Sequence, residues 1–399
     1  MIKGRDIIVH GLQSLDSTIG SNCVDIAQIF SKDNRVLYVN FPIDRLTLIR
    51  HGSNPLIKNR KDILDGKQPD LVKINNNLWN LNPKTKLESI SRLTFRPLFS
   101  HLNRINNKRY AKQVQKAINE LGFKDYIIFN DSDFYRAFFF KELLKPSLSV
   151  YYTRDNMRET AFFKKNGAYF EDQLMKKTDL IVSNSMYLND IAKKNNPNTV
   201  YVGQGCDVSL YNKELITEIP EDIKSIPSPV IGYIGALKSS RLSIEILEHI
   251  AISNPVWNVV LVGPEDDIFA NSKLHDIKNV NFLGSKKESE LPKYLSAFDI
   301  ALNPQALNEL TIGNYPRKID EYLAMGKPVV ATLTETMKAF TDYTYLANNK
   351  EEYIKLITKA LEEDSEELSK SRIIFARTHT WENNVKAIYN AIIKTEKNI

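Results

Sequence analysis

Short apolar runs alternate with longer amphipathic stretches along most of this chain. The apolar runs of the first half have the length of strands: Asp6–His10, Val36–Asn40, Tyr126–Phe129, Leu148–Tyr152, Leu180–Ser183 and Thr199–Val202. Amphipathic segments such as Cys23–Phe30 and Tyr169–Lys177 lie between several of them. This alternation is typical of parallel sheets covered by helices. We therefore expect an α/β fold.

The pattern is interrupted between Ile216 and Pro229, where prolines lie among acidic residues and serines, which is typical of a linker. A second alternating series follows, with strands predicted at Val230–Ile234, Val259–Val262, Val280–Leu283, Ile300–Asn303 and Val329–Thr332. We expect a first domain over 1–212, a linker over 213–229 and a second domain over 230–380, with a cleft between two Rossmann-like sheets. Ligands of such sheets bind at the carboxyl ends of the strands.

Composition agrees with a globular protein, since 42% of the 399 residues are hydrophobic and 26% are charged. No apolar run approaches the roughly 18 residues that span a bilayer. The residues before Ile7 do not resemble a signal peptide. Cys23 and Cys206 offer neither a disulfide framework nor a zinc spacing. We expect a cytoplasmic protein, at the inner face of a membrane.

The net charge of +6 is unevenly distributed. Between Lys84 and Lys116 the chain carries nine Lys or Arg residues and a single acid, Glu88, with leucine and phenylalanine interleaved. Such a stretch can lie on an anionic membrane as a peripheral contact. It can also be a solvated helix pair whose apolar side is core, or bind nucleic acid. Because no nucleic-acid-binding motif accompanies it, we expect no nucleic-acid partner.

Three strand ends of the second domain are rich in glycine. Gly235 follows the strand Val230–Ile234 and would let a phosphate approach the backbone, while Lys238 and Arg241 would supply positive charge. Gly263 ends the next strand. Leu283 and Gly284 end the one after it, where backbone groups can hydrogen-bond a flat base. Each glycine is equally compatible with a simple turn.

The segment from Asn308 to Thr332 combines a loop, a short helix and a strand. Pro316 suits the first turn of a helix, and Gly326 suits its carboxyl-terminal cap. Lys318 and Glu321 stand three apart, on one helical face. A lysine favours a phosphate, and a carboxylate accepts hydrogen bonds from paired hydroxyl groups. We expect a nucleoside diphosphate site here, although Lys318 and Glu321 could also form a surface ion pair.

This segment resembles the donor-binding signature of GT-B glycosyltransferases, chiefly the retaining family-4 type. The likeness rests on Pro-x-Lys-x-x-Glu-Tyr-Leu-Ala-x-Gly-Lys-Pro-Val-Val from Pro316 to Val330. Further segments follow the family's order: Thr178–Ser185, Val202–Asp207, Gly232–Gly235, Leu261–Pro264, Val280–Gly284 and Phe298–Pro304. The resemblance covers most of residues 125–395 and is most specific in the second domain. It implies that residues 381–399 form a helix packing back on the first domain.

By this resemblance the second domain binds a UDP- or GDP-sugar. Glu321 would hold the ribose, the diphosphate would lie beside Lys318, Lys238 and Arg241, and the base would lie near Leu283. The family often has another glutamate eight positions before Glu321, where this chain has Gly313. Glu309 could replace it, or the backbone of Gly313, Asn314 and Tyr315 could contact the sugar.

The resemblance places the acceptor in the first domain, and it implies that Gly20 and Ser21 form the loop that faces the donor phosphate. Three residues at strand ends are candidates for a catalytic group: Asp155, Asp131 and His10. Each has a structural alternative, as a turn or cap residue for the aspartates and as a buried strand residue for His10.

The sequence therefore predicts a glycosyltransferase of surface polysaccharide biosynthesis. It would transfer a sugar to a saccharide or a lipid-linked glycan, with the nucleotide-sugar as co-substrate and without a metal or other cofactor. Two alternatives are a sugar-nucleotide epimerase of the same fold and a degenerate GT-B protein that binds a nucleotide or glycan without turnover. Gly313 favours the second alternative.

Overall fold

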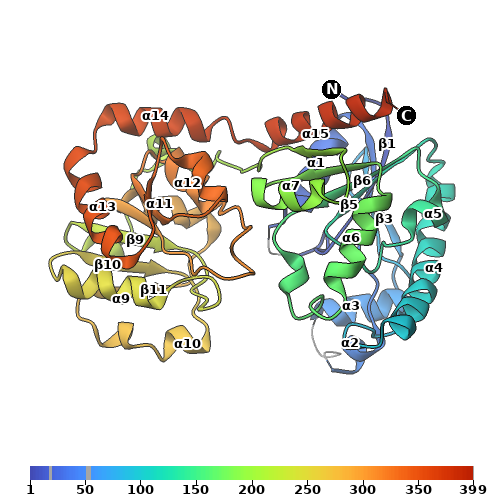
Figure 1. Ribbon diagram of the computed structural model, residues 1–399, viewed down its shortest axis with the longest axis horizontal. Coiled ribbons are helices and arrows are strands. Elements are labelled where there is room, and N and C mark those ends of the chain that lie inside the picture. The colour runs from blue at the N-terminus through green and yellow to red at the C-terminus, as the bar shows by residue number, and fades with distance from the viewer. Residues whose placement is uncertain (18–19, 51–54, 399) are drawn as a thin grey trace. The chain divides into compact units, whose positions relative to one another are not determined.

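The computed structural model describes residues 1–17, 20–50 and 55–398. It divides into two compact units, residues 1–203 with 384–399 and residues 204–383. Each unit is an α/β structure built on one sheet (Figure 1). The predicted fold class is confirmed. No helix in the described part of the chain is both long and apolar enough to cross a membrane.

The sheet of the first unit has the strand order β3-β4-β2-β1-β5-β6-β7-β8. Its strands are β1 (Asp6–Gly11), β2 (Arg35–Val39), β3 (Leu71–Lys73), β4 (Leu78–Leu81), β5 (Ile127–Asp131), β6 (Leu148–Thr153), β7 (Leu180–Ser183) and β8 (Thr199–Tyr201). All neighbouring pairs are parallel except β3 with β4. The carboxyl ends of the parallel strands therefore share one edge. The sequence pattern missed β3 and β4, which are short and partly polar.

The helices of the first unit are α1 (Asn22–Asp33), α2 (Arg45–Arg50), α3 (Pro55–Leu64), α4 (Arg96–Leu121), α5 (Phe140–Leu144), α6 (Gly167–Lys177), α7 (Met186–Lys193) and α15 (Trp381–Glu396). Short 3-10 turns also occur. The basic stretch 84–116, for which a helix pair was one of the alternatives, contains the long helix α4, which ends at Gly122 in a left-handed conformation. Tyr110 and Val114 of α4 pack on the sheet with Ile8 and Ile128.

Residues 384–399, which include most of helix α15, belong to the first unit. Tyr389 stacks on Phe30 of α1 with ring centroids 5.3 Å apart, and its hydroxyl accepts a hydrogen bond from Asn34 at 2.9 Å. Thr395 accepts a hydrogen bond from Asn198 at 3.1 Å. The chain thus enters the second unit after Gly203 and returns after Asn383.

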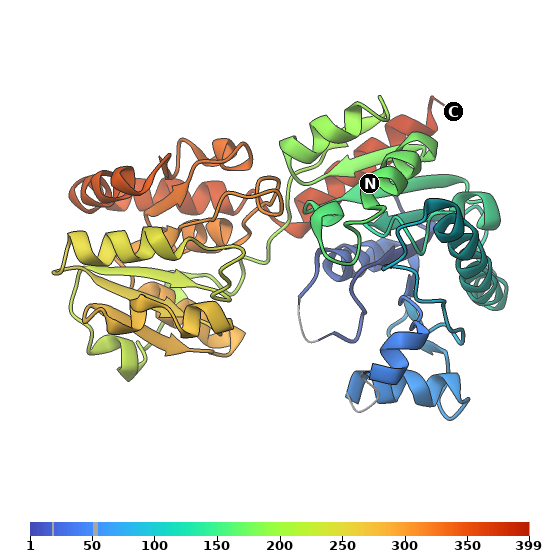
Figure 2. The same cartoon turned by 60° about the horizontal axis from the view of Figure 1, so that its bottom comes forward.

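The sheet of the second unit is wholly parallel, in the order β11-β10-β9-β12-β13-β14. Its strands are β9 (Val230–Ile234), β10 (Asn258–Val262), β11 (Val280–Gly284), β12 (Ile300–Asn303), β13 (Val329–Thr332) and β14 (Tyr345–Ala347). Its helices are α8 (Glu221–Lys224), α9 (Ile244–Ser253), α10 (Asp267–Ala270), α11 (Leu291–Ser296), α12 (Lys318–Ala324), α13 (Lys350–Glu363) and α14 (Glu366–Ala376). Figure 2 shows helices on both sides of this sheet.

Strand residues of the second unit alternate between two cores. Val260 and Ala301 pack with α11, α12 and α14, whereas Leu261 and Leu302 pack with α9 and α13. This period of two is what a sheet buried on both faces requires. The predicted linker 213–229 differs from the structure: it lies in the second unit, and its Ile223 is buried in that core. Apolar Ile223 on the short helix α8 explains why this segment packs.

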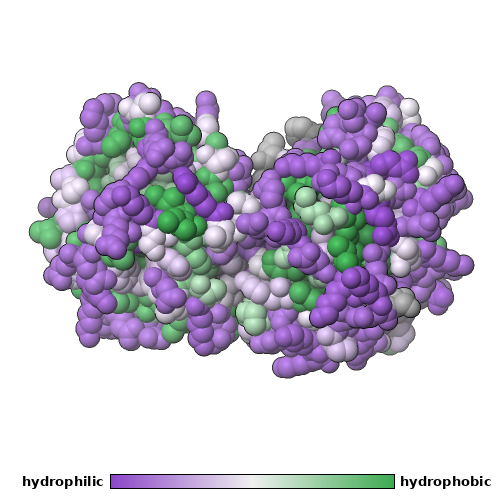
Figure 3. Space-filling model, turned by 90° about the horizontal axis from the view of Figure 1, so that it is seen from above, coloured by the Kyte–Doolittle hydropathy of each residue, from purple (hydrophilic) through white to green (hydrophobic). Residues whose placement is uncertain are grey.

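The surface carries scattered apolar areas among hydrophilic residues, as the face in Figure 3 shows. In the second unit, α14 exposes Ile374, and in the first unit, the start of α4 exposes Phe95 and Leu98.

Candidate functional site

Glycines with unusual backbone angles lie at the carboxyl edge of the second sheet. Gly235 after β9 has φ of 142°, and Gly263 after β10 has φ of 149°. A Cβ atom on Gly263 would collide with the backbone carbonyl oxygen of Gly235. Only glycine readily adopts this region, so the two strand ends can touch as they do. Backbone rather than side chains therefore forms this part of the edge.

Lys318, on the first turn of α12, reaches this glycine turn. Its Nζ donates a hydrogen bond to the hydroxyl of Tyr233 and lies 4.0 Å from the centroid of that ring. A Cβ on Gly235 would lie 2.6 Å from the same Nζ. The lysine is thus positioned by a tyrosine and by the lack of a side chain at Gly235. It presents a positive charge at the strand end.

Glu321 lies one helical turn after Lys318, and its side chain is largely buried. Burial raises the pKa of its carboxyl group above the usual value, while Arg317 and Lys318 lower it in part. Tyr211 hydrogen-bonds the Glu321 carboxylate; burial and this carboxylate both raise the pKa of the Tyr211 hydroxyl. The site therefore holds a carboxylate in a poorly solvated place beside two cations.

Lys238 and Arg241 lie in the exposed loop after Gly235. This loop is tied to the segment after β12: Ala306 donates its N–H to the carbonyl of Arg241 at 2.9 Å, and Asn308 donates to the carbonyl of Ser240 at 3.0 Å. The structure thereby brings two of the predicted donor-binding segments together. Both cations follow the glycine turn closely in sequence.

The loop before α12 is compact. Thr311 is buried and donates a hydrogen bond to the carbonyl of Ala306, and Asn314 donates its N–H to the carbonyl of Thr311 at 3.0 Å. Gly313, Asn314 and Tyr315 are buried, whereas Glu309 is exposed. The N–H of Asn314, one of the backbone groups expected to contact a sugar, is thus taken by the loop itself.

The side chain of Tyr315 points into the second unit. It hydrogen-bonds Asp320, and its hydroxyl lies 3.4 Å from Nδ1 of His379. Asp320 is fully buried and lies 2.7 Å from the same ring nitrogen. Burial raises the pKa of Asp320, and its contact with His379 lowers it in part. Tyr315 therefore serves an internal network, which sequence reasoning did not foresee.

Leu283 and Gly284, expected near a base, end β11 at the same edge. Leu283 is half-buried against the core, and Gly284 is exposed with φ of 67°. The carbonyl of Gly284 accepts a hydrogen bond from the N–H of Gly263 at 2.9 Å. The strand ends at Gly235, Gly263 and Gly284 are consequently neighbours in the order of the sheet.

In the first unit, two catalytic candidates share one arginine. Nε of Arg154 donates to both carboxylate oxygens of the buried Asp131, at 2.8 and 2.9 Å. Asp155 has a left-handed φ of 57°, and its carboxylate lies 3.4 Å from Nη1 of Arg154. Burial lowers the pKa of Arg154. The two aspartates raise it by a larger amount, so the pKa lies above its usual value. The pair is therefore held as a charged cluster at the carboxyl ends of β5 and β6.

His10 has no exposed surface. Its Nε2 lies 3.1 Å from Asp133, and its Nδ1 lies 2.9 Å from the hydroxyl of Tyr110. Burial raises the pKa of Asp133. Arg136 and His10 lower it by a larger amount, so the pKa falls below the usual range. This is the arrangement of a structural histidine and does not present a base to a ligand.

Ser21 caps α1: its carbonyl accepts hydrogen bonds from the N–H groups of Val24 and Asp25, both at 3.0 Å. Gly20 is exposed, and a Cβ there would meet nothing within 4 Å among the described residues. Thr18 and Ile19, which precede this turn in the predicted phosphate loop, lie outside the described residues.

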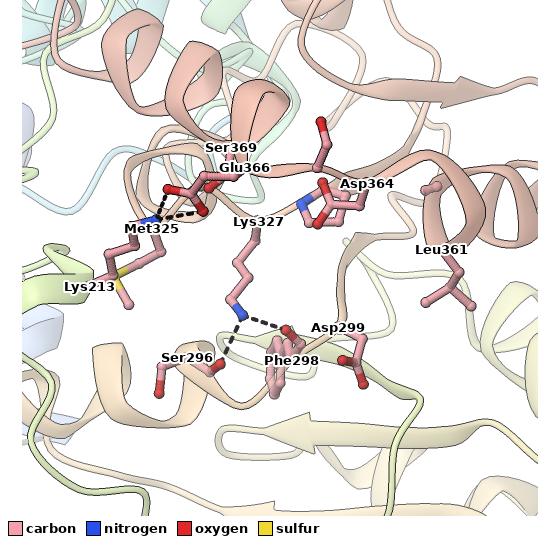
Figure 4. Close-up of a pocket in the computed structure, with 14 residues that line it drawn as sticks. Lys213, Ser296, Phe298, Asp299, Met325, Lys327, Leu361, Asp364, Glu366 and Ser369 are labelled. Atoms are coloured by element: carbon pink, nitrogen blue, oxygen red, sulfur yellow. Dashed lines mark hydrogen bonds and ion pairs between the residues drawn. The ribbon is translucent and has the colours of Figure 1, made fainter.

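A separate cavity of 540 Å³ opens at the amino edge of the second sheet (Figure 4). Lys327 points across it and donates to the carbonyls of Ser296 and Phe298, at 2.8 and 2.6 Å. Lys213 pairs with Glu366 at 3.1 Å. Lys327 and Lys213 therefore already have partners within the protein. The cavity has the character of a structural polar pocket, and it lies at the edge of the sheet opposite to the glycine turns.

Comparisons with known proteins bear on the second unit most directly. Residues 228–363 match the protein family described as Glycosyl transferases group 1. This segment contains Gly235, Gly263, Lys318 and Glu321. The resemblance inferred from the signature is thus confirmed.

One curated relative of this protein is TuaH of Bacillus subtilis (strain 168), provisionally named a teichuronic acid biosynthesis glycosyltransferase. The two are 30% identical over 159 residues, 38% of this chain and 40% of TuaH. The match therefore spans less than half of the length of either protein.

Solved structures show the same fold over nearly the whole chain. Sucrose-phosphate synthase from Thermosynechococcus elongatus matches with a TM-score of 0.70 and 12% identity, covering 99% of this chain and 100% of that one. HepE of Anabaena in complex with UDP matches with a TM-score of 0.65 and 15% identity, covering 98% and 100%. At these identities the likeness establishes the GT-B architecture alone.

Sequence reasoning found Lys318 and Glu321 but missed the tyrosines that position them. Tyr233 is a strand residue and Tyr211 precedes the second sheet, so neither stands at helical spacing from its partner. A tyrosine two residues before a glycine turn has many ordinary roles, and no local signal distinguishes this one.

Proposed function

We propose that the protein is a glycosyltransferase of polysaccharide biosynthesis that uses a UDP- or GDP-sugar. The observation that carries this proposal is the placement of Lys318 and Glu321 beside the glycine turn at Gly235, within a group 1 domain. HepE, a neighbour in fold, has been solved with UDP and with UDP-glucose, which supports a nucleotide-sugar donor. The name of TuaH supports polysaccharide biosynthesis.

In this proposal the two side chains divide the donor between them. Glu321 accepts hydrogen bonds from ribose hydroxyls, and Lys318, with Lys238 and Arg241, offsets the charge of the diphosphate. During transfer the bond between the anomeric carbon and the diphosphate oxygen breaks, and an acceptor hydroxyl oxygen forms the new bond and releases its proton. Positive charge beside the departing diphosphate stabilises the transition state. The proposed acceptor is a saccharide or a lipid-linked glycan.

A thermal-shift panel of UDP, GDP, ADP and their sugars tests the donor. A nucleotide at a hundred times its dissociation constant adds roughly 2.7 kcal/mol of stability. We expect UDP or GDP, but not ADP, to raise the melting temperature. A protein that responds to none of them does not fit the proposal.

A transfer assay with the donor that binds separates the enzyme from its alternatives. Release of nucleoside diphosphate that depends on a glycan acceptor supports a transferase. Conversion of the donor without any acceptor supports an epimerase, and binding without conversion supports the degenerate protein that Gly313 favours.

We also propose that the first unit contacts a membrane through residues 84–116, at the cytoplasmic face. Phe95 and Leu98 at the start of α4 are 66% and 44% exposed, with Arg96 between them. Exposed apolar side chains beside cations suit an anionic bilayer. Not every residue of the stretch is available: Phe99 is buried, and Arg109 pairs with Glu88 at 2.8 Å.

Liposome co-sedimentation tests this contact. We expect a Phe95→Ser/Leu98→Ser variant to bind anionic vesicles at least tenfold more weakly than the wild type. Ile374→Ser removes an exposed apolar side chain from α14 of the second unit and should leave binding unchanged. Equal binding by all three proteins would rule out the contact.

A further inference from the structure

A cavity of 190 Å³ lies at the carboxyl edge of the first sheet. The loops after β1 and β2 form two of its walls, and α3 forms the third. Most of its lining is apolar, contributed by Leu12, Phe41, Ile43 and Ile57. Sites for whole ligands usually have roughly 300–1,000 Å³. The cavity therefore suits one terminal group of a larger molecule.

One cation, Arg60, lines this cavity. Its side chain is only 11% exposed, and its Nη2 donates to the carboxylate of Asp16 at 2.9 Å. Its Nη1 is buried, and no group among the described residues accepts a hydrogen bond from it. Burial lowers the pKa of Arg60, and Asp16 raises it in part. A buried charged donor without an acceptor is costly, so an incoming acceptor oxygen is favoured here.

The Asp16 carboxylate does not cancel this preference. Asp16 is 33% exposed, so water screens its charge, and it engages Nη2 and not Nη1. The loop that carries Asp16 is held in place at two points: Tyr38 donates to the carbonyl of Gln13 at 2.7 Å, and Leu15 donates its N–H to Asn40 at 2.8 Å. The cavity is thus formed before any ligand arrives.

We propose that this cavity binds an anionic group of the acceptor, a carboxylate or a phosphate ester, with Nη1 of Arg60 donating to one of its oxygens. Charge-assisted hydrogen bonds from arginine to such oxygens are strong and directional. The apolar walls contact the carbon face of the attached sugar. The identity of the group as part of an acceptor rests on the proposed transferase function; the anion site itself does not.

Binding of three probes to the full chain tests the site: glucuronate, inorganic phosphate and glucose, followed by ligand-observed NMR. We expect glucuronate or phosphate to bind at least tenfold more tightly than glucose, and the better probe identifies the anion. Arg60→Gln should remove this preference, with at least a tenfold loss of affinity. Lys58→Gln, at an exposed lysine of the same helix, should not.

A second measurement needs no variant. Phenylglyoxal modifies arginine, and mass spectrometry follows the reaction at Arg60, which the better probe should slow at least severalfold. The proposal would be overturned if all three probes bind with equal affinity, or if glucose alone protects Arg60 from phenylglyoxal. It would also be overturned if Arg60→Gln binds as tightly as the wild type and no probe protects Arg60. Binding of UDP and of GDP is measured in parallel. If the wild type binds neither nucleotide, the transferase function is contradicted and the anion result still stands.

Discussion

At the scale of single residues, Glu321 shows a conflict between stability and ligand binding. Its carboxyl group lies beside Arg317 and Lys318, yet burial dominates and raises its pKa. The folded state therefore binds the proton more tightly than the unfolded chain does. Ionised Glu321 weakens the folded state at pH values above its folded pKa, and this effect fades as the pH falls toward the usual value of 4.5.

We expect Glu321→Gln to be more stable than the wild type at pH 7 and to bind nucleotide more weakly. A gain of about 1 kcal/mol would raise the melting temperature of a domain of this size by roughly 2–4 °C. The difference between the two proteins should shrink as the pH is lowered toward 4.5. Melting curves between pH 4.5 and 8 provide the measurement, and a Glu321→Gln protein that is less stable at pH 7 would contradict it.

The sequence was informative about residues whose partners are close along the chain. Lys318 and Glu321 could be assigned to one helical face because a helix has a fixed period. The contact of Lys318 with Tyr233 could not be predicted, since these residues are far apart in sequence and meet only when β9 lies beside α12. The same holds for Arg154 and Asp131, which join two neighbouring strand ends.

At the scale of elements, the glycine turns hold the edge of the second sheet together. Gly263 and Gly284 both have positive φ, but only Gly263 faces another backbone atom, the carbonyl oxygen of Gly235. A Cβ on Gly284 would meet nothing within 4 Å among the described residues. Comparing substitutions at the two positions therefore separates the cost of the steric contact from the cost of the backbone conformation.

We expect Gly284→Ala to lower the free energy of unfolding by about 1–2 kcal/mol, the usual cost of an alanine in the left-handed conformation. Gly263→Ala should lower the free energy of unfolding by at least about 2 kcal/mol more than Gly284→Ala does, because the strand ends must also move apart. Chemical denaturation of both variants measures these losses. If the two substitutions cost the same, the contact between Gly235 and Gly263 does not matter for the fold.

Strands of the central sheets were predictable because each is a short, buried apolar run, as at β7 and β13, whose predicted and observed bounds coincide. The edge strand β3 was missed because its three residues, Leu71, Val72 and Lys73, are too few to show a periodic pattern, and the last two are exposed. Residues 213–229 looked like a linker from their prolines, but packing of Ile223 overrode this local signal.

At the scale of the whole molecule, the described chain forms two compact units, and the first depends on the last helix. Tyr389 of α15 is 2% exposed, stacks on Phe30 and bonds Asn34. We expect Tyr389→Ala to destabilise the first unit by roughly 3–5 kcal/mol, and Tyr389→Phe by about 1 kcal/mol through loss of the hydrogen bond.

Scanning calorimetry with and without the nucleotide that binds, UDP or GDP, follows both units in one experiment. The first-unit transition should fall in Tyr389→Ala, while the rise that the nucleotide produces in the second-unit transition should persist. A Tyr389→Ala protein that loses its response to the nucleotide would show that the two units do not fold separately.

The most direct test of the central claim, a nucleotide-sugar site built from Lys318 and Glu321, is a calorimetric titration of UDP and GDP. We expect the wild type to bind at least one of them, and we expect Lys318→Ala and Glu321→Ala each to weaken binding at least tenfold, about 1.4 kcal/mol. Lys350→Ala and Glu245→Ala, which break an exposed ion pair of 2.6 Å in the same unit, should bind like the wild type. Equal affinity in all five proteins would show that Lys318 and Glu321 do not form the nucleotide site.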